Sequence, residues 1–234
     1  VFDRMKNTIE DTFKDYGFLA IDTPVIEKNE ILFAKGGGET EKQIFEIASE
    51  SKDMSLRFDL TVPLARYVSE HLSELNFPFK RYQIGKVYRG ERNQKGRYKE
   101  FYQADIDIIG NNSLSIYNDA LLARVIFEAF NRINFPNITF HINNRKLLNG
   151  FFKSIEIEDS TEVLRTIDKK DKIGLDKTRD LLVNLIGEEK SNKTLEFINA
   201  SEDNEKVLEK LTDFAGNDLY LEGLDELKTV YEYM

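Results

Sequence analysis

The strongest constraint on the fold of this chain is a pair of alternating segments separated by a polar turn. Polar and apolar residues alternate over residues 81–89 and again over residues 98–109, and the sequence Asn-Gln-Lys-Gly stands between them at 93–96. Period-two alternation on both sides of a short loop is typical of a β-hairpin. We therefore predict two antiparallel strands that neighbour each other.

The turn of this hairpin reverses the charge of the chain. The whole protein has a formal net charge of −9, yet Glu91 is the only acid between Lys80 and Lys99. The basic residues of this stretch are Lys80, Arg81, Lys86, Arg89, Arg92, Lys95, Arg97 and Lys99. A local reversal of charge indicates a site for an anionic ligand.

Alternation sorts the side chains of the second strand onto two faces. Tyr102, Ala104, Ile106 and Ile108 form a packed face, and Phe101, Gln103, Asp105 and Asp107 form a polar face. An aromatic ring can stack on a base, and a carboxylate can accept hydrogen bonds from an amine or imidazole. The polar face therefore suits a ligand. A solvated outer face of the sheet explains the same alternation.

A second alternating run lies upstream, where residues 55–60 lead into a helix that we expect to begin near Pro63. Thr61 stands where an N-cap residue is expected, and Asp59 fits a capping or solvent-facing acid. We expect residues 42–48 and 55–60 to pair as another hairpin, with a charged turn at 49–53. Gly36, Gly37 and Gly38 lack the Gly-Lys-Ser/Thr of a phosphate loop and predict an ordinary mobile loop.

Other elements follow from local pattern. Apolar residues at helical spacing predict a helix over 2–13 that ends at Gly17, and Pro24 interrupts the strand that follows. A helix from an N-cap at Ser113 to Ile133 and a strand over 135–142 complete the first part. Further helices are expected at 162–170, 176–186, 192–198, 204–214 and 225–233.

Charge divides the chain into two parts. Residues 1–150 hold 21 acids and 21 bases, whereas 151–234 hold 21 acids and 12 bases. We therefore predict domains over 1–150 and 151–234. The chain has no cysteine and two histidines, which excludes disulfides and a cysteine- or histidine-rich metal site. The sequence contains no apolar run of 18 residues, so we predict no membrane span.

Three segments together resemble class II histidyl-tRNA synthetases. They are Arg89-Gly-Glu91-Arg92, then Gly96-Arg97-Tyr98-Lys99-Glu100-Phe101, then Gln103-Ala-Asp105-Ile-Asp107. The string LRFDLTVPLAR at 56–66 is similar to the amino-acid-binding segment of that family, and the first helix with Pro24 resembles its dimer-forming first motif.

The resemblance implies a role for each matching residue. Arg89 would hold the ATP α-phosphate and the substrate carboxylate and act in catalysis. The nucleotide would also be bound by Glu91, Arg97, Tyr98 and Phe101, with Phe101 on the adenine. Histidine would be bound by Asp59, Thr61, Arg89, Gln103 and Asp107. No protein metal ligand is implied.

The resemblance also implies a fold and an activity. The fold class would be α+β, an antiparallel sheet flanked by helices, followed by a mostly helical insertion that approaches tRNA. The activity would be ATP- and Mg²⁺-dependent histidine activation and transfer to tRNA, by a cytoplasmic homodimer. The family's third motif and anticodon-binding domain have no counterpart in the sequence, so we expect a fragment with little activity alone.

Two other functions remain open at this stage. A non-catalytic paralogue, such as the regulatory subunit of ATP phosphoribosyltransferase, could keep the fold and sense histidine. The basic loop and the insertion-like region argue against it. A dimerisation or nucleic-acid-binding module could use the basic hairpin, but Asp59, Gln103 and Asp107 would then share no purpose.

Overall fold

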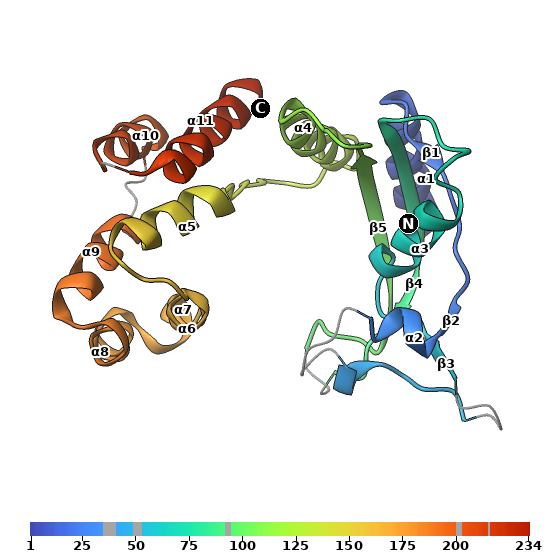
Figure 1. The fold of residues 1–234 in the computed structure, drawn as a ribbon. Coiled ribbons are helices and arrows are strands. Elements are labelled where there is room, and N and C mark those ends of the chain that lie inside the picture. The colour runs from blue at the N-terminus through green and yellow to red at the C-terminus, as the bar shows by residue number, and fades with distance from the viewer. Residues whose placement is uncertain (35–40, 49–52, 92–94, 200–202, 215) are drawn as a thin grey trace. The chain divides into compact units, whose positions relative to one another are not determined.

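The computed structural model describes residues 1–34, 41–48, 53–91, 95–199, 203–214 and 216–234 (Figure 1). Helices and strands combine in an α+β fold, as expected. The chain divides into two compact units, Val1–Thr139 and Phe140–Met234. None of the helices described is long and apolar enough to cross a membrane.

The first unit is built on the hairpin that the alternation predicts. Strands β4 (Phe79–Tyr88) and β5 (Glu100–Ile109) pair antiparallel along their whole length. The short strand β1 (Leu19–Ala20) lies parallel to β4 at its other edge. Residues 93 and 94 of the expected turn lie outside the described residues.

One face of this sheet forms the apolar core of the unit. Helices α1 (Phe2–Asp15) and α4 (Tyr117–Arg132) supply the other side of the core. The buried members are Phe13, Phe18, Tyr82, Ile108, Val125 and Ala129. Gly17 has a φ of 79° and ends α1 as predicted. The N-cap expected at Ser113 is wrong, because α4 begins only at Tyr117 and Ser113 bridges Asn111 instead.

The segment before β4 pairs differently from the prediction. Strand β3 (Met54–Leu56) forms its ladder with β2 (Ile26–Lys28), which continues into α2 (Asn29–Leu32). Residues 42–48 do not form the expected strand. Glu41–Gln43 is a 3-10 turn, and Glu46 makes a single antiparallel bridge to Ser55. Backbone nitrogens of Ile47 and Leu56 donate to the carbonyls of Met54 and Phe45 beside this bridge, so the expected pairing of the two segments is confirmed only over this short stretch. The turn at 49–52 and Gly36–Gly38 lie outside the described residues.

The strand expected over 135–142 is absent from the structure, although these residues are all described. Asn134 and Asn137 both have positive φ values, 56° and 49°, which strand geometry does not allow. Pro136 also lacks a backbone N–H to donate to a neighbouring strand. The apolar residues in this segment were therefore a misleading signal.

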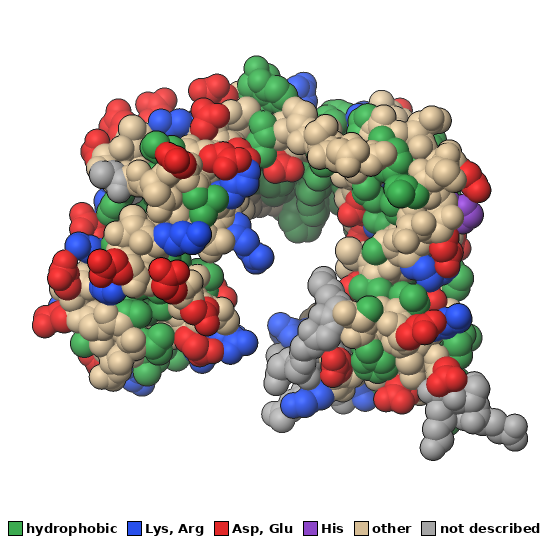
Figure 2. Space-filling view, in the orientation of Figure 1, with side chains coloured by type: hydrophobic (Ala, Val, Ile, Leu, Met, Phe, Trp, Pro, Cys, Tyr) green, Lys and Arg blue, Asp and Glu red, His purple; other side chains and the backbone are tan. Residues whose placement is uncertain are grey.

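In its described residues, the second unit contains helices and the loops that connect them, and no strand. Its helices are α5 (Arg145–Ser154), α6 (Thr161–Ile167), α7 (Lys170–Ile173), α8 (Leu175–Ile186), α9 (Glu188–Ile198), α10 (Asn204–Asp213) and α11 (Asp218–Tyr233). Four of the five expected helical segments are confirmed, and the one expected over 162–170 is divided between α6 and α7 by a turn at residues 168–169. Acidic and basic side chains are interspersed over the surface of these helices (Figure 2).

Helices α5 and α11 pack closely against each other, so α5 belongs to the second unit from its first turn (Figure 1). A Cβ atom on Gly150 would lie 2.5 Å from the backbone nitrogen of Tyr220, so a side chain there would force the helices apart. Phe151 is buried and stacks on Phe197 with ring centroids 3.9 Å apart. Residue 150, where the change in charge placed a boundary, therefore lies inside α5. The charge of the chain changes at a different position from its packing.

Candidate active site

The polar face of the β4–β5 hairpin brings three of the predicted ligand residues, Phe101, Gln103 and Asp107, into one row. Register places Val87 opposite Phe101, Gly85 opposite Gln103, Gln83 opposite Asp105 and Arg81 opposite Asp107. Directly opposed residues in an antiparallel pair project to the same side of the sheet. From Phe101 to Asp107 this floor extends about 20 Å along the strand. An aromatic ring therefore stands at one end and carboxylates at the other.

A buried ion pair closes the acidic end of the floor. Arg81 is fully buried, and its Nη2 lies 2.5 Å from Oδ2 of Asp107. The contact has the distance of an ion pair but not the angles of a hydrogen bond, since Oδ2 has no hydrogen-bond partner. Burial raises the pKa of Asp107 even though Arg81 opposes the rise. Desolvation therefore outweighs the attraction within the pair.

Asp105 belongs to the site although the residue roles drawn from the resemblance omit it. Burial raises its pKa, and the charges of Asp107 and Asp59 raise it further, while Arg81 and Arg89 lower it. These interactions mean that all four charged groups lie near Asp105. The signal was present in the sequence, because Asp105 stands between Gln103 and Asp107 on the same face of the strand.

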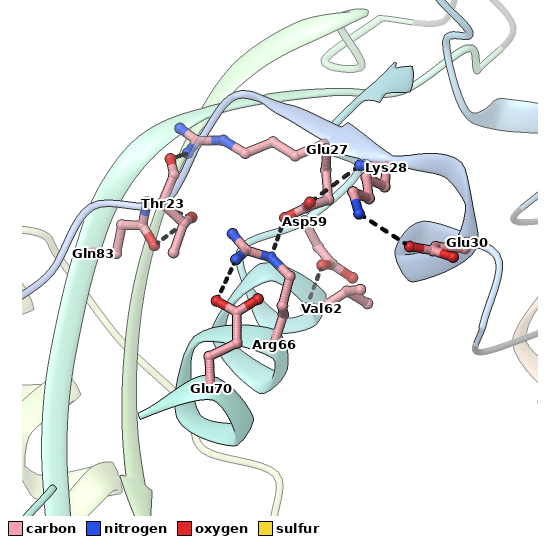
Figure 3. Close-up of polar contacts among 10 residues, drawn as sticks. Thr23, Glu27, Lys28, Glu30, Asp59, Val62, Arg66, Glu70 and Gln83 are labelled. Carbon is pink, nitrogen blue, oxygen red and sulfur yellow. Dashed lines mark hydrogen bonds and ion pairs between the residues drawn. The ribbon is translucent and has the colours of Figure 1, made fainter. Parts of the chain in front are cut away.

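Asp59 caps helix α3 (Thr61–Glu70). Its Oδ1 accepts a hydrogen bond from the backbone nitrogen of Val62 at 2.9 Å (Figure 3). The same oxygen accepts a second hydrogen bond from the backbone nitrogen of Thr61 at 3.1 Å. The prediction of Thr61 as the capping residue is wrong, because Thr61 is the first residue of the helix and contributes a donor. The capping role considered for Asp59 is confirmed. Its second oxygen takes no part in these two bonds.

Arg89 lies between two aromatic rings at the other end of the floor. The carbon of its guanidinium is 4.5 Å from the ring centroid of Phe58 and 5.1 Å from that of Phe101. Its Nε donates to the carbonyl oxygen of Phe58 at 3.2 Å. Within the described residues no carboxylate lies at ion-pair distance from Arg89. The rings of Phe58 and Phe101 thus hold the Arg89 guanidinium in place, and its positive charge is available to a ligand.

The remaining predicted nucleotide residues lie around the hairpin turn. Nη1 of Arg97 donates to Oε2 of Glu91 at 2.7 Å, and the Arg97 side chain is exposed. Tyr98 is 70% exposed. The structure thus joins Glu91 to Arg97 but brings neither Arg97 nor Tyr98 onto the floor. Arg92 lies outside the described residues.

A buried arginine that the prediction missed fixes the segment carrying Asp59. Nε of Arg57 donates to the carbonyl of Lys86 at 2.8 Å, and Nη1 donates to the carbonyl of Thr23 at 2.6 Å. A Cβ on Gly85 would lie 2.5 Å from Nη2 of Arg57, so the glycine makes room for the guanidinium. Arg57 thereby ties its own segment to strand β4 and to the chain before β2.

Two further polar contacts support the same segment (Figure 3). Arg66 of α3 donates to Glu27 of β2 at 2.8 Å and to Glu70 at 2.7 Å. Gln83 of β4 donates to the hydroxyl of Thr23 at 3.1 Å and to Asp22 at 2.9 Å. The bonds from Arg66 to Glu27 and from Gln83 to Asp22 and Thr23 join residues far apart in the sequence, so alternation alone gave no signal for them. Together they fix α3 and its first turn beside the floor.

Comparison with known proteins identifies the family. A family model described as histidyl-tRNA synthetase matches residues 2–234. The chain is 54% identical to a histidine-tRNA ligase of Clostridium tetani across its whole length, and 52% identical to one of Finegoldia magna across 99% of it. It covers 54% of each relative, so it spans about half the length of the curated relatives it matches.

Solved structures agree with this assignment. A histidyl-tRNA synthetase from Nostoc sp. superposes with a TM-score of 0.87 at 34% identity, covering 98% of this chain and 53% of that one. An ATP phosphoribosyltransferase regulatory subunit/histidyl-tRNA synthetase from Bacillus halodurans shares the fold, with a TM-score of 0.81 at 17% identity, covering 99% of this chain and 59% of that one. The chain belongs to the histidyl-tRNA synthetase family.

Proposed function

We propose that this chain supplies the histidine- and ATP-binding face of a histidine-tRNA ligase. In that reaction the histidine carboxylate attacks the α-phosphorus of ATP, pyrophosphate leaves, and histidyl-adenylate forms. A tRNA hydroxyl then attacks the histidyl carbonyl and releases AMP. The observation that carries the proposal is the single polar floor, with Arg89 between two rings at one end and the partly buried carboxylates of Asp105 and Asp107 at the other. A ligand that combines a base, a phosphate and an amino acid matches this order of groups.

At the nucleotide end, Phe101 stacks on adenine and Arg89 binds the α-phosphate together with the histidine carboxylate. Adenylation brings two anions together, so neutralising charge and fixing the line of attack lower the barrier. A carboxylate is already ionised at neutral pH, so the reaction needs no general base. Glu91, Arg97 and Tyr98 act near the nucleotide from the hairpin turn.

At the amino-acid end, Asp59 binds the ammonium group with the oxygen that does not cap α3, and Thr61 lies beside it. Asp107 and Gln103 bind the imidazole ring. Oε1 of Gln103 is buried without a hydrogen-bond partner, which is consistent with an acceptor that a ligand satisfies. Buried polar groups of this kind reject side chains that cannot pair with them.

Mg²⁺ accompanies ATP in this proposal. The ion prefers carboxylates combined with substrate phosphates and retained waters to a cage of protein ligands. In the described part of the chain no group of three or more His, Cys, Asp or Glu residues could hold a metal. No step here depends on the ion.

The proposal extends to partners of the whole protein: tRNA as the acceptor, a second copy of the chain, and the cytoplasm as the site of tRNA charging. Support for a homodimer comes from apolar side chains exposed on the segment that resembles the first motif. These are Phe2, Met5, Leu19, Val25 and Ile26. Light scattering should give twice the chain mass, and Leu19→Lys should shift it toward the monomer.

Separate titrations of ATP and L-histidine test the proposal. We expect both to bind, and Phe101→Leu to weaken ATP binding by about 1–3 kcal/mol because a stacking ring is lost. Phe127→Leu, at an exposed phenylalanine of α4, is the matched control and should leave ATP binding unchanged. Binding of histidine alone would favour a histidine sensor. Binding of neither ligand would favour an interaction module.

A further inference from the structure

Arg81 stands out among the buried residues because its surroundings satisfy it poorly. Its side chain is fully buried, yet Nε and Nη1 have no hydrogen-bond partner. Nη2 reaches the carbonyl of Leu60 at 3.5 Å, the limit of a hydrogen bond, and Oδ2 of Asp107 at 2.5 Å. Buried unpaired donors destabilise a fold. Stability therefore does not explain this arginine.

The ion pair with Asp107 gives no stronger structural reason. Burial lowers the pKa of Arg81 and raises the pKa of Asp107, so both partners are pushed toward their neutral forms. A buried pair of this kind is often no more stabilising than apolar residues of similar volume. What Arg81 does provide is a positive charge against one particular carboxylate of the ligand floor.

The charges around Asp107 show what the loss of Arg81 would change. Asp105 lies on the same strand face, Asp59 comes from the segment before α3, and Arg89 lies toward the nucleotide end. Around Asp105, the carboxylates of Asp59, Asp105 and Asp107 thus interact with two guanidinium groups, those of Arg81 and Arg89. Arg81 is the guanidinium that opposes the raised pKa of Asp107, whereas Arg89 acts on Asp105 from the nucleotide end. Without Arg81 that opposition is lost. Asp107 would then hold its proton to higher pH.

We propose that Arg81 is a positioning residue for recognition of the histidine ring: it keeps the Asp107 carboxylate ionised and fixed in one orientation, so that a free oxygen accepts a hydrogen bond from the imidazole N–H. This inference rests on the proposed function. A protonated Asp107 could donate its own hydrogen and would no longer demand an N–H from the ligand. Arg81 therefore acts on specificity through Asp107 without touching the substrate.

Calorimetric titration of L-histidine into the chain and its Arg81→Leu variant tests this role. At neutral pH we expect the variant to bind histidine about 10- to 100-fold more weakly, the range for a hydrogen bond to a charged group. The difference in affinity between the variant and the unmodified chain should shrink as the pH rises, because alkaline conditions ionise Asp107 again. ATP affinity should change less than about twofold.

Two further variants separate charge from packing. Arg81→Lys keeps a positive charge and should bind histidine more tightly than Arg81→Leu but more weakly than the unmodified chain, since lysine lacks the planar fork. Lys80→Leu removes the neighbouring cation, whose Nζ lies 5.9 Å from the ring of Phe18 on the opposite face of the sheet. It is the matched control and should match the unmodified chain. Thermal unfolding of each variant is measured first, and Arg81→Lys carries the test if Arg81→Leu does not fold.

The outcomes separate the two proposals. Equal histidine affinity in the unmodified chain and Arg81→Leu would overturn the role of Arg81 while leaving the proposed function intact. An equal loss of histidine and ATP binding at every pH would also overturn it, because that is the effect of a structural residue. If the unmodified chain binds ATP but not histidine, the proposed function itself fails at the amino-acid end, and the role of Arg81 fails with it.

Discussion

The two units of this protein bury polar groups in opposite ways. In the described residues, the buried charged side chains Glu27, Arg57 and Arg81 all belong to the first unit. The buried polar residues of the second unit are the hydroxyl residues Thr166, Thr178, Ser191 and Thr194. The three threonines donate to carbonyls of their own helices, four residues back.

This difference separates a unit organised around a ligand site from one organised around packing. A hydroxyl that bonds within its own helix needs no distant partner, and the surrounding core can remain apolar. A buried charge needs a partner from another element, which fixes the position of both. Arg57 and Glu27 connect the chain before and within β2 to the segment around Asp59 in this way. We therefore expect substitutions in the two units to affect different measurements.

The largest expected effect is on the stability of the second unit. Phe151→Ala should lower the free energy of unfolding by about 3–5 kcal/mol, because it removes a buried ring packed against Phe197 and Phe214. Leu185→Ala, at an exposed position of α8, is the control and should change it little. Chemical denaturation measures both. A unit that tolerates Phe151→Ala would not be organised by its apolar core.

The next effect is on binding by the first unit. Arg89→Ala should weaken ATP binding by about 1.5–3 kcal/mol, because it removes hydrogen bonds to a charged group. The melting temperature should stay nearly constant, since Arg89 bonds only weakly to Phe58. Calorimetry and thermal unfolding give the two values. A large loss of stability with unchanged ATP affinity would show that Arg89 has a structural role instead.

A third prediction separates the two roles of Asp59. Asp59→Ala should cost about 0.5–2 kcal/mol of stability, because the cap of α3 is lost, and should also abolish the contact with the ammonium group. Asp59→Asn keeps a capping oxygen and should retain stability while still weakening histidine binding. Denaturation and histidine titration of both variants decide this. Full histidine affinity in Asp59→Asn would leave the residue with a structural role only.

The smallest expected effect concerns the pH dependence of stability. Burial raises the pKa of Asp105, so the folded state binds its proton more tightly than the unfolded state does. The contribution of Asp105 to stability should therefore fall as pH rises above the ordinary aspartate value of about 3.9. Asp105→Asn should make this fall shallower, and Asp119→Asn at an exposed site of α4 should not. Melting curves across this pH range test it, and parallel curves for Asp105→Asn would contradict it.

Local periodicity in the sequence was sufficient for the elements that build the site. The hairpin of β4 and β5, its two faces and the helical nature of the second unit all follow from the spacing of residues within one segment. Alternation also placed Phe101, Gln103, Asp105 and Asp107 on one face, because the period of a strand is a property of its own backbone.

Tertiary structure decided whatever depends on a second segment. Residues 135–142 have apolar side chains but no pairing strand, and β3 takes its ladder from β2 rather than from residues 42–48. Asp59 caps α3 because the folded structure places its carboxylate next to the backbone nitrogens of the first turn. The burial of Arg81 against Asp107 likewise required both the strand register and the covering segment at Leu60. Pairing and desolvation are set by neighbours in space, which the order of residues along the chain does not specify.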